Sequence, residues 1–244
     1  MSDDEISERI GEPLPRTWTR QDITEIKVRA EEMWNDMHPR QPAPAFRLPE
    51  NQCDNDTERE ARRRWLSVRP GDIVLDIGSA DGAWAIPAAM AGAVVMALDC
   101  NENTRLTENC AKEDVFAPGW NFSVTFHQMF AFSSNGVAEI QGKRIPAWTI
   151  DSFVLSNNIR KVDFVKIDVE GHELEVLKGM FGTLVRDHPD LVIEVHIETV
   201  PSMPMVTVEE VKSLFAGLDY RFEAMDCEYN GGKYAMLYAT ARTE

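Results

Sequence analysis

Five short apolar runs recur through the middle and later parts of the chain, with helical or loop-like segments between them. Each run has the length of one strand. This layout predicts an α/β fold in which helices cover both faces of a mostly parallel sheet. The runs are DIVLDIG at 72–78, AVVMALD at 93–99, SVTFHQMF at 123–130, VDFVKID at 162–168 and LVIEVHI at 191–197.

The last part of the chain predicts a C-terminal antiparallel hairpin. Two strand-like runs in residues 220–240 flank Asn230, Gly231 and Gly232, which suit a tight turn.

The N-terminal part has a different pattern. Apolar residues recur at helical spacing from 19 to 37 and predict an amphipathic helix, and prolines then interrupt residues 38–52. A second helix is expected at 57–68, before Pro70 and Gly71. We therefore expect residues 1–56 to form an N-terminal helix and a proline-rich strap, followed by an α/β domain at 57–244.

The charge balance narrows the classes of partner. The chain has 25 basic and 41 acidic residues, so 25 − 41 gives −16, which argues against binding to nucleic acid or to an anionic membrane. The N-terminus lacks the order of a secretory signal, and Pro87 and Gly92 interrupt the most apolar run, at 83–98. Four cysteines without a CxxC pair fit reduced thiols. A cytoplasmic protein is expected.

The first candidate site follows the first strand of the sheet. Asp76, Gly78 and Gly82 lie in IVLDIGSADGAW, where a strand passes into a helix and ligands of doubly wound sheets bind. A dinucleotide fingerprint would need glycine where Ala80 and Ala83 stand, so binding of a pyrophosphate is disfavoured.

Asp99 ends the next strand and is expected to accept hydrogen bonds from ribose hydroxyls. This feature is common to nucleotide-binding folds, so it fits a nicotinamide cofactor and S-adenosylmethionine equally. The alternative is that the glycines only make a tight turn, which Asp99 caps.

The second candidate site lies at the ends of two later strands. Alternation places Lys166, Asp168 and Glu170 on one face, and likewise groups Glu194 and His196. One crossover helix between the two runs would make the strands parallel neighbours. Unpaired buried charges are costly, so this pattern predicts a binding or catalytic site.

Several charged residues nearby have structural interpretations as well. Lys166 either pairs with an acid or binds a ligand, and His172 is either an ordinary first-turn residue or functional. Glu173 and Glu175 are expected to face solvent in the first turn of the crossover helix.

Four stretches of the chain carry a resemblance to a known family: VDFVKIDVEGHELEVLKG, VLDIGSADG, FAFSSNG and PDLVIEVH. Over residues 70–197 the chain closely resembles the FkbM-type family of S-adenosylmethionine-dependent methyltransferases. The resemblance implies a Rossmann-like class I methyltransferase with a seven-stranded sheet. One departure is Ser79-Ala80-Asp81, which replaces the family's usual Ala-Asn pair. Asp81 then either contacts the ammonium group of the cofactor or caps the helix.

The resemblance also assigns site residues. The expected cofactor-binding residues are Asp76, Gly78, Ser79, Asp81, Gly82, Asp99, Phe130 and Ala131. The expected catalytic residues are Asp168, Glu170, His172, Glu194 and His196. Asp76, Gly78 and Gly82 would contact the methionine part, Asp99 the ribose, and the stretch from Phe130 the adenine.

The function expected from these residues is O-methylation of a hydroxyl on a sugar or a small natural-product-like acceptor. His196 or Glu170 would be the general base, with His172 as a further candidate. Asp168 and Glu194 would hold the acceptor or would share Mg²⁺ or a similar cation. Residues 1–56 would act as a lid, mediate a homodimer or pack on the domain.

Two other functions stay open. One is a non-catalytic regulatory protein that binds a nucleoside cofactor, and the other is a nicotinamide-dependent oxidoreductase.

Overall fold

A computed structural model describes residues 41–42, 56–102, 104–112, 124–140, 142–198, 205–229 and 232–241. The helix expected at 19–37 lies outside these residues, as does the proline-rich segment apart from Gln41 and Pro42. The boundary expected near residue 56 therefore stays a prediction.

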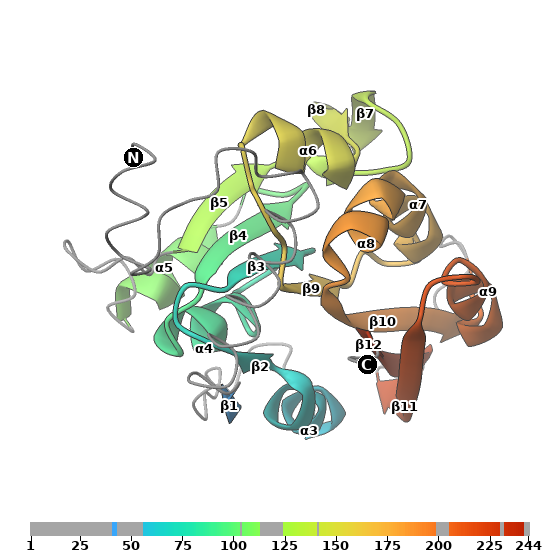
Figure 1. Ribbon diagram of the computed structural model, residues 1–244. Helices are drawn as coiled ribbons and strands as arrows, with labels where there is room; N and C mark the ends of the chain where they lie inside the picture. The colour runs from blue at the N-terminus through green and yellow to red at the C-terminus, as the bar shows by residue number, and fades with distance from the viewer. Residues whose placement is uncertain are drawn as a thin grey trace, which may run out of the picture. The chain divides into compact units, whose positions relative to one another are not determined.

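A seven-stranded sheet forms the centre of the described fold (Figure 1). Its order is β11 (Tyr220–Tyr229), β12 (Gly232–Ala241), β10 (Asp190–Glu198), β9 (Phe164–Ile167), β3 (Ile73–Ile77), β4 (Val94–Asp99) and β5 (Val124–Gln128). Strands β10, β9, β3, β4 and β5 pair in parallel, whereas β12 is antiparallel to both of its neighbours. The mostly parallel sheet and the C-terminal hairpin are confirmed.

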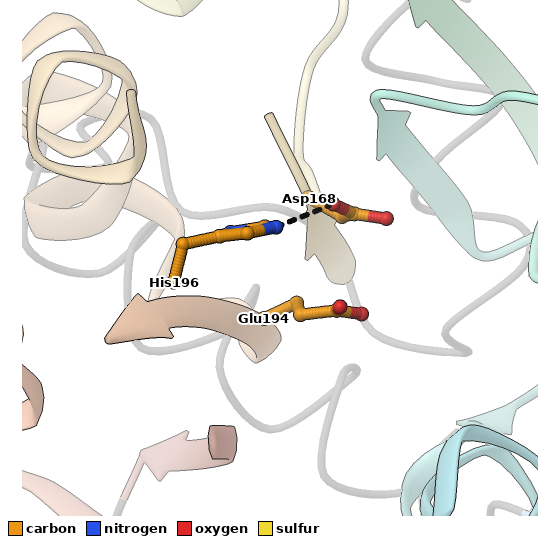
Figure 2. Close-up of side chains that lie close together, drawn as sticks. All are labelled: Asp168, Glu194 and His196. Atoms are coloured by element: carbon orange, nitrogen blue, oxygen red, sulfur yellow. Dashed lines mark ion pairs between the residues drawn. The ribbon is translucent and has the colours of Figure 1, made fainter. Parts of the chain in front are cut away.

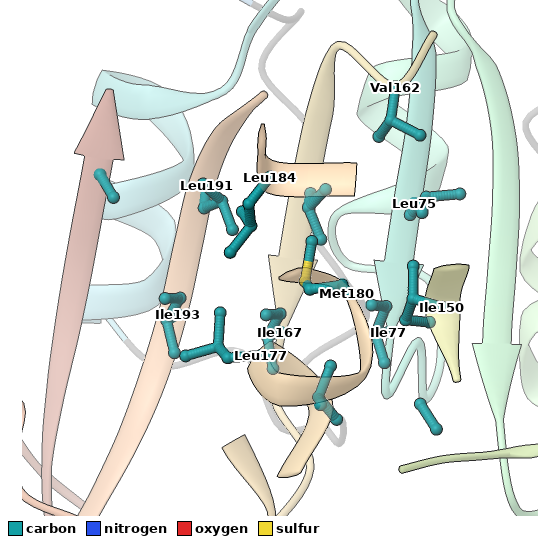
Figure 3. Close-up of a cluster of buried hydrophobic side chains, with 14 of the residues drawn as sticks. Leu75, Ile77, Ile150, Val162, Ile167, Leu177, Met180, Leu184, Leu191 and Ile193 are labelled. Carbon is teal, nitrogen blue, oxygen red and sulfur yellow. The ribbon is translucent and has the colours of Figure 1, made fainter. Parts of the chain in front are cut away.

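Helices cover both faces of this sheet, and each face has its own apolar core. On one face, α6 (Ile150–Ser156), α7 (Glu173–Gly179), α8 (Phe181–Asp187) and α9 (Val208–Ser213) pack on alternate strand residues. Figure 3 shows this core, in which Leu177 and Met180 lie over Ile167 and its neighbours. On the other face lie α3 (Asp56–Trp65), α4 (Ala85–Met90) and α5 (Thr104–Lys112).

Two helix predictions were wrong in detail. The crossover between β9 and β10 is two helices, α7 and α8, which meet at Met180. A Cβ on Gly179 would lie 2.1 Å from the Phe132 carbonyl oxygen, so α7 approaches that loop more closely than another residue type would allow. The helix expected to reach residue 68 ends at Trp65, because Ser67–Val68 form β2, which pairs with β1 (Gln41–Pro42).

A three-stranded sheet was not predicted. It comprises β6 (Phe130–Ala131), β8 (Lys143–Trp148) and β7 (Gly136–Ile140), in that order. The run expected as one strand at 123–130 therefore ends at Gln128, and its last residue, Phe130, pairs with β8. This small sheet lies beside the main sheet, where β6 contacts β4.

The parallel strands bring their carboxyl ends to one edge of the sheet. The register pairs Asp76 with Lys166 across β3 and β9, and Ile167 with Ile193 across β9 and β10. Asp168 follows Ile167 at the end of β9, and Glu194 follows Ile193 in β10. The topology therefore places the two candidate sites side by side. In the described part of the chain, no helix is long and apolar enough to cross a membrane.

Candidate functional site

The loop after β3 fits tightly against the end of β9. Gly78 has φ +75°, and a Cβ built on it would lie 1.7 Å from the Asp168 carbonyl oxygen. Ala80 also has a positive φ, of 41°.

Pro87 is the third residue of α4, where the backbone N–H would have no helical partner. Pro87 is therefore accommodated in the first turn of α4.

Asp99 holds this loop at the end of β4. One carboxylate oxygen accepts the Ala80 N–H at 3.0 Å, and the other accepts the Asn101 N–H at 2.8 Å. Each oxygen can accept a second hydrogen bond, so these contacts leave Asp99 able to accept bonds from a ligand. The capping role and the ribose role are therefore compatible.

Two cavities open at this edge, and they share Ala80, Asp99, Asn101, Asp168 and Glu170. The first has a volume of about 390 Å³ and a largely apolar wall beyond Asp99. That wall contains Ile77, Leu98, Met129, Phe130, Ala131, Ile140, Val169 and His172. The second has a volume of about 380 Å³ and a more polar wall. Its further residues include Glu58, Ser79, Asp81, Trp84, Glu102, Arg105 and Lys166.

Lys166 lies beneath both candidate sites and neutralises two acids. Its Nζ donates to the Gly78 carbonyl oxygen at 2.9 Å and to Asp168 Oδ2 at 3.2 Å, and lies 3.8 Å from Asp76 Oδ1. Burial opposes the charged form, yet Asp168 and Asp76 outweigh it and raise the pKa of Lys166. Burial raises the pKa of Asp76 to about 6, although the lysine acts against this change. Lys166 is thus a paired cation that joins the glycine loop to β9.

His196 is fully enclosed, with 1% of its side chain exposed, and is surrounded by carboxylates. Nδ1 lies 2.8 Å from Glu173 Oε1, and Nε2 lies 3.2 Å from Glu170 Oε2 and 3.8 Å from Asp168 Oδ1. Burial alone would lower the pKa of His196, but hydrogen bonding to the two glutamates and the charge of Asp168 raise it to about 11. The imidazole is therefore doubly protonated near neutral pH and donates from both nitrogens.

Glu194 is held in its neutral form, whereas His196 is held in its charged form. Burial, with the charges of Asp168 and Glu58 added, raises the pKa of Glu194 to about 8, against the effects of Lys166 and His196. Its carboxyl group is therefore mostly protonated near neutral pH. Figure 2 shows Glu194 and His196 on β10, with the imidazole directed toward Asp168.

Asp168, Glu194 and His196 form the cluster that best matches the predicted metal site. Asp168, Glu194 and His196 each offer one ligand atom, and these atoms lie within 4.8 Å of one another. However, both nitrogens of His196 already face carboxylates, and the Lys166 ammonium contacts Asp168. A divalent cation would have to displace these bonds. The donor set therefore fits an ammonium–imidazolium network better than a Mg²⁺ site.

The structure divides the predicted residues between the cavity walls and the layer beneath them. Asp168, Glu170, His172, Gly78, Ser79, Asp81, Asp99, Phe130 and Ala131 line one or both cavities. Asp76, Gly82, Glu194 and His196 are not among the wall residues of these two cavities. Gly82 instead packs against Leu106 and Ile86.

The expectation that Glu173 faces solvent is wrong, because its side chain is 0% exposed. Packing of α7 against the end of β10 encloses it, although its position in the first turn is as predicted. Sequence reasoning also missed Glu58, which accepts the Trp84 indole N–H at 2.9 Å. It comes from α3, far from either motif, and no signal in the sequence placed it at the site.

The strand order, the reversed β12 and the cavity at the ends of β3, β4 and β9 define a Rossmann-like class I methyltransferase fold. The FkbM methyltransferase domain model matches residues 76–222, and the chain belongs to that family.

The chain is similar to hexuronic acid methyltransferase AglP of Haloferax volcanii, with 30% identity over 156 residues. That match covers 58% of this chain and 63% of the relative, which is less than two thirds of the relative's length.

Two solved structures share the fold. The FkbM methyltransferase of Methylobacillus flagellatus KT superposes with a TM-score of 0.57 at 17% identity, over 72% of this chain and 46% of that one. The precorrin-6y C5,15-methyltransferase of Geobacter metallireducens GS-15 gives a TM-score of 0.50 at 14% identity, over 81% and 94% of the two chains.

Proposed function

We propose that the protein is an S-adenosylmethionine-dependent O-methyltransferase that acts on a hydroxyl of a small, sugar-like acceptor. The observation that carries this proposal is the pair of adjoining cavities, which share Asp99, Asp168 and Glu170. Both volumes lie within the range of about 300–1,000 Å³ that is usual for small-molecule sites.

The first cavity suits the nucleoside. Asp99 supplies acceptors for ribose hydroxyls, while Met129, Phe130 and Ala131 form an apolar wall for a purine ring. When bound, S-adenosylmethionine supplies an electrophilic methyl group on a positively charged sulfur. Carboxylates at the junction of the cavities, from Asp168 and Glu170, favour a cation there.

Glu170 is the proposed general base. Its side chain is 63% exposed and lines both cavities, so it can reach an acceptor hydroxyl that lies beside the cofactor. It would take the hydroxyl proton as the acceptor oxygen forms its bond to the methyl group and the bond from that methyl group to sulfur breaks, which would leave S-adenosylhomocysteine. His196 is disfavoured as the base because its pKa, about 11, leaves it already protonated. It holds the Glu170 carboxylate instead.

The second cavity suggests a neutral acceptor. Six carboxylates contribute to its wall, from Glu58, Asp81, Asp99, Glu102, Asp168 and Glu170. Of the two cations in the wall, Lys166 is committed to the bonds beneath Gly78 and Asp168, which leaves Arg105. Carboxylates accept hydrogen bonds from hydroxyls and repel an anionic ligand. We therefore favour a neutral sugar hydroxyl over a uronic acid.

The test is methyl transfer from labelled S-adenosylmethionine to a panel of matched neutral sugars and uronic acids, with products identified by mass spectrometry. The proposal expects a methyl ether on a neutral member of the panel and a loss of about 100-fold or more in kcat for Glu170→Gln. Cofactor binding without transfer to any panel member or to small molecules of a cell extract would instead favour the regulatory protein.

A further inference from the structure

We propose that Glu173 is a positioning residue that fixes the Glu170 carboxylate at the junction of the two cavities. This inference rests on the proposed function of Glu170 as the base. It concerns a glutamate that the sequence pattern placed in solvent and that neither cavity contacts.

The first contact is with the backbone of the turn that carries Glu170. Glu173 Oε1 accepts the Gly171 N–H at 2.9 Å. Glu170 and Gly171 both have positive φ, at 54° and 92°, and the left-handed conformation is costly for a glutamate. A turn of this kind persists only when its surroundings hold it, and the bond from Gly171 is one such restraint.

The second contact reaches Glu170 through its side chain. The same Oε1 accepts the Nδ1–H of His196 at 2.8 Å. On the opposite side of the ring, Nε2 lies 3.2 Å from Glu170 Oε2. Tyr234 packs edge-on against the imidazole, with ring centroids 5.0 Å apart, so the ring has little freedom to turn. One carboxylate oxygen of Glu173 therefore fixes the turn and, through His196, the Glu170 side chain.

The cost of burying Glu173 supports a specific role. Its side chain is 0% exposed, and in the described part of the chain its Oε2 has no hydrogen-bond partner. Leaving a buried polar atom without a hydrogen bond destabilises the folded state, and an apolar residue at this position would avoid that loss. The arrangement therefore gives up stability in order to place two bonds on Oε1.

Two substitutions separate the loss of the bonds from a change of the buried group that makes them. Glu173→Ala removes both bonds, whereas Glu173→Gln retains an Oε1 that can accept them and replaces Oε2 by an amide NH2. Glu209→Gln is the matched control, because Glu209 is also a first-turn glutamate but lies exposed on α9. Each protein is analysed by crystallography and by NMR of ¹⁵N-labelled histidine, and neither readout needs an acceptor.

In Glu173→Ala, we expect the contact between His196 Nε2 and Glu170 Oε2 to be lost and the NMR signal of His196 to shift. Glu173→Gln should retain more of this contact, and the control should match the native protein. If Glu173→Ala does not fold, Glu173→Leu takes its place, because leucine also removes both bonds but fills more of the buried space, and a changed Glu170 position is again the supporting result. An unchanged Glu170 position in every folded variant would overturn the proposal.

Kinetics distinguish positioning from general support of the fold. Glu173→Ala should lower kcat by about 10-fold or more, with affinity for S-adenosylhomocysteine unchanged, and should cost nothing further in a Glu170→Gln background. Additive losses would contradict the proposal. If the native protein transfers no methyl group, the proposed function fails, whereas the NMR and crystal comparison still decides whether Glu173 positions Glu170.

Discussion

Gly78→Ala tests the close contact between the cofactor loop and β9. The added Cβ would lie 1.7 Å from the Asp168 carbonyl oxygen, far below the 3.0 Å that real Cβ contacts respect. The atom in its way belongs to the backbone, so the loop or the end of β9 must move. Because both cavities are bounded by these two segments, we expect the variant to lose stability and cofactor affinity together.

Gly142→Ala provides a matched control, because Gly142 has φ +76° against +75° for Gly78 but has nothing within 4 Å of the added Cβ. Both variants carry the left-handed backbone cost of about 1 kcal/mol. Only Gly78→Ala adds overpacking, of about 1–3 kcal/mol. The expected total is then about 2–4 kcal/mol for Gly78→Ala and about 1 kcal/mol for the control.

Thermal unfolding and calorimetric titration with S-adenosylhomocysteine measure these effects. At about 2–4 °C per kcal/mol, the control should lower Tm by about 2–4 °C and Gly78→Ala by about 4–16 °C. Gly142→Ala should bind as tightly as the native protein. Equal Tm changes, or native affinity in Gly78→Ala, would refute the reasoning.

Three further predictions concern Asp99, His196 and the need for a metal. Asp99→Ala should weaken S-adenosylhomocysteine binding by about 10-fold or more in calorimetry, with Asp99→Asn intermediate, because bonds to a charged acceptor are lost; native affinity in both variants would exclude the ribose role. The folded-state pKa of His196, about 11, lies above its ordinary value of 6.5, so its contribution to stability is complete below pH 6.5 and is lost as pH rises toward 11. Between pH 8.5 and 10, where Glu194 is mostly ionised, His196 should contribute a decline of up to about 1.4 kcal/mol per pH unit to the stability measured by urea unfolding, which His196→Gln should remove; equal slopes in the two proteins would contradict this. Dialysis against EDTA should leave S-adenosylhomocysteine affinity and methyl transfer unchanged, and a loss that Mg²⁺ restores would show that a metal belongs to the site.

The sequence predicts most of the sheet because burial on both faces leaves a simple signal. Apolar runs identified β3, β4, β9 and β10, and the expectation that Asp168 approaches Glu194 at the ends of β9 and β10 agrees with the structure. It could not predict the small β6–β8–β7 sheet, whose strands are short and carry many exposed residues. Local patterns of that kind resemble those of loops.

The site is less predictable where packing between distant elements decides the environment. A first-turn glutamate normally faces water, and only the packing of α7 on β10 buries Glu173. The ionisation of His196 likewise depends on three acids from the β9–α7 loop and from α7, whose distances no spacing rule supplies. The sequence therefore offered His196 and Glu170 as alternatives for the base and gave no means of choosing between them.

A crystal structure of the protein with S-adenosylhomocysteine tests the central claim most directly. We predict that the nucleoside lies in the first cavity, with its ribose hydroxyls on Asp99, its base beside Phe130 and its sulfur near Asp168 and Glu170. A ligand bound elsewhere, or a nucleoside that leaves Asp99 uncontacted, would contradict the account.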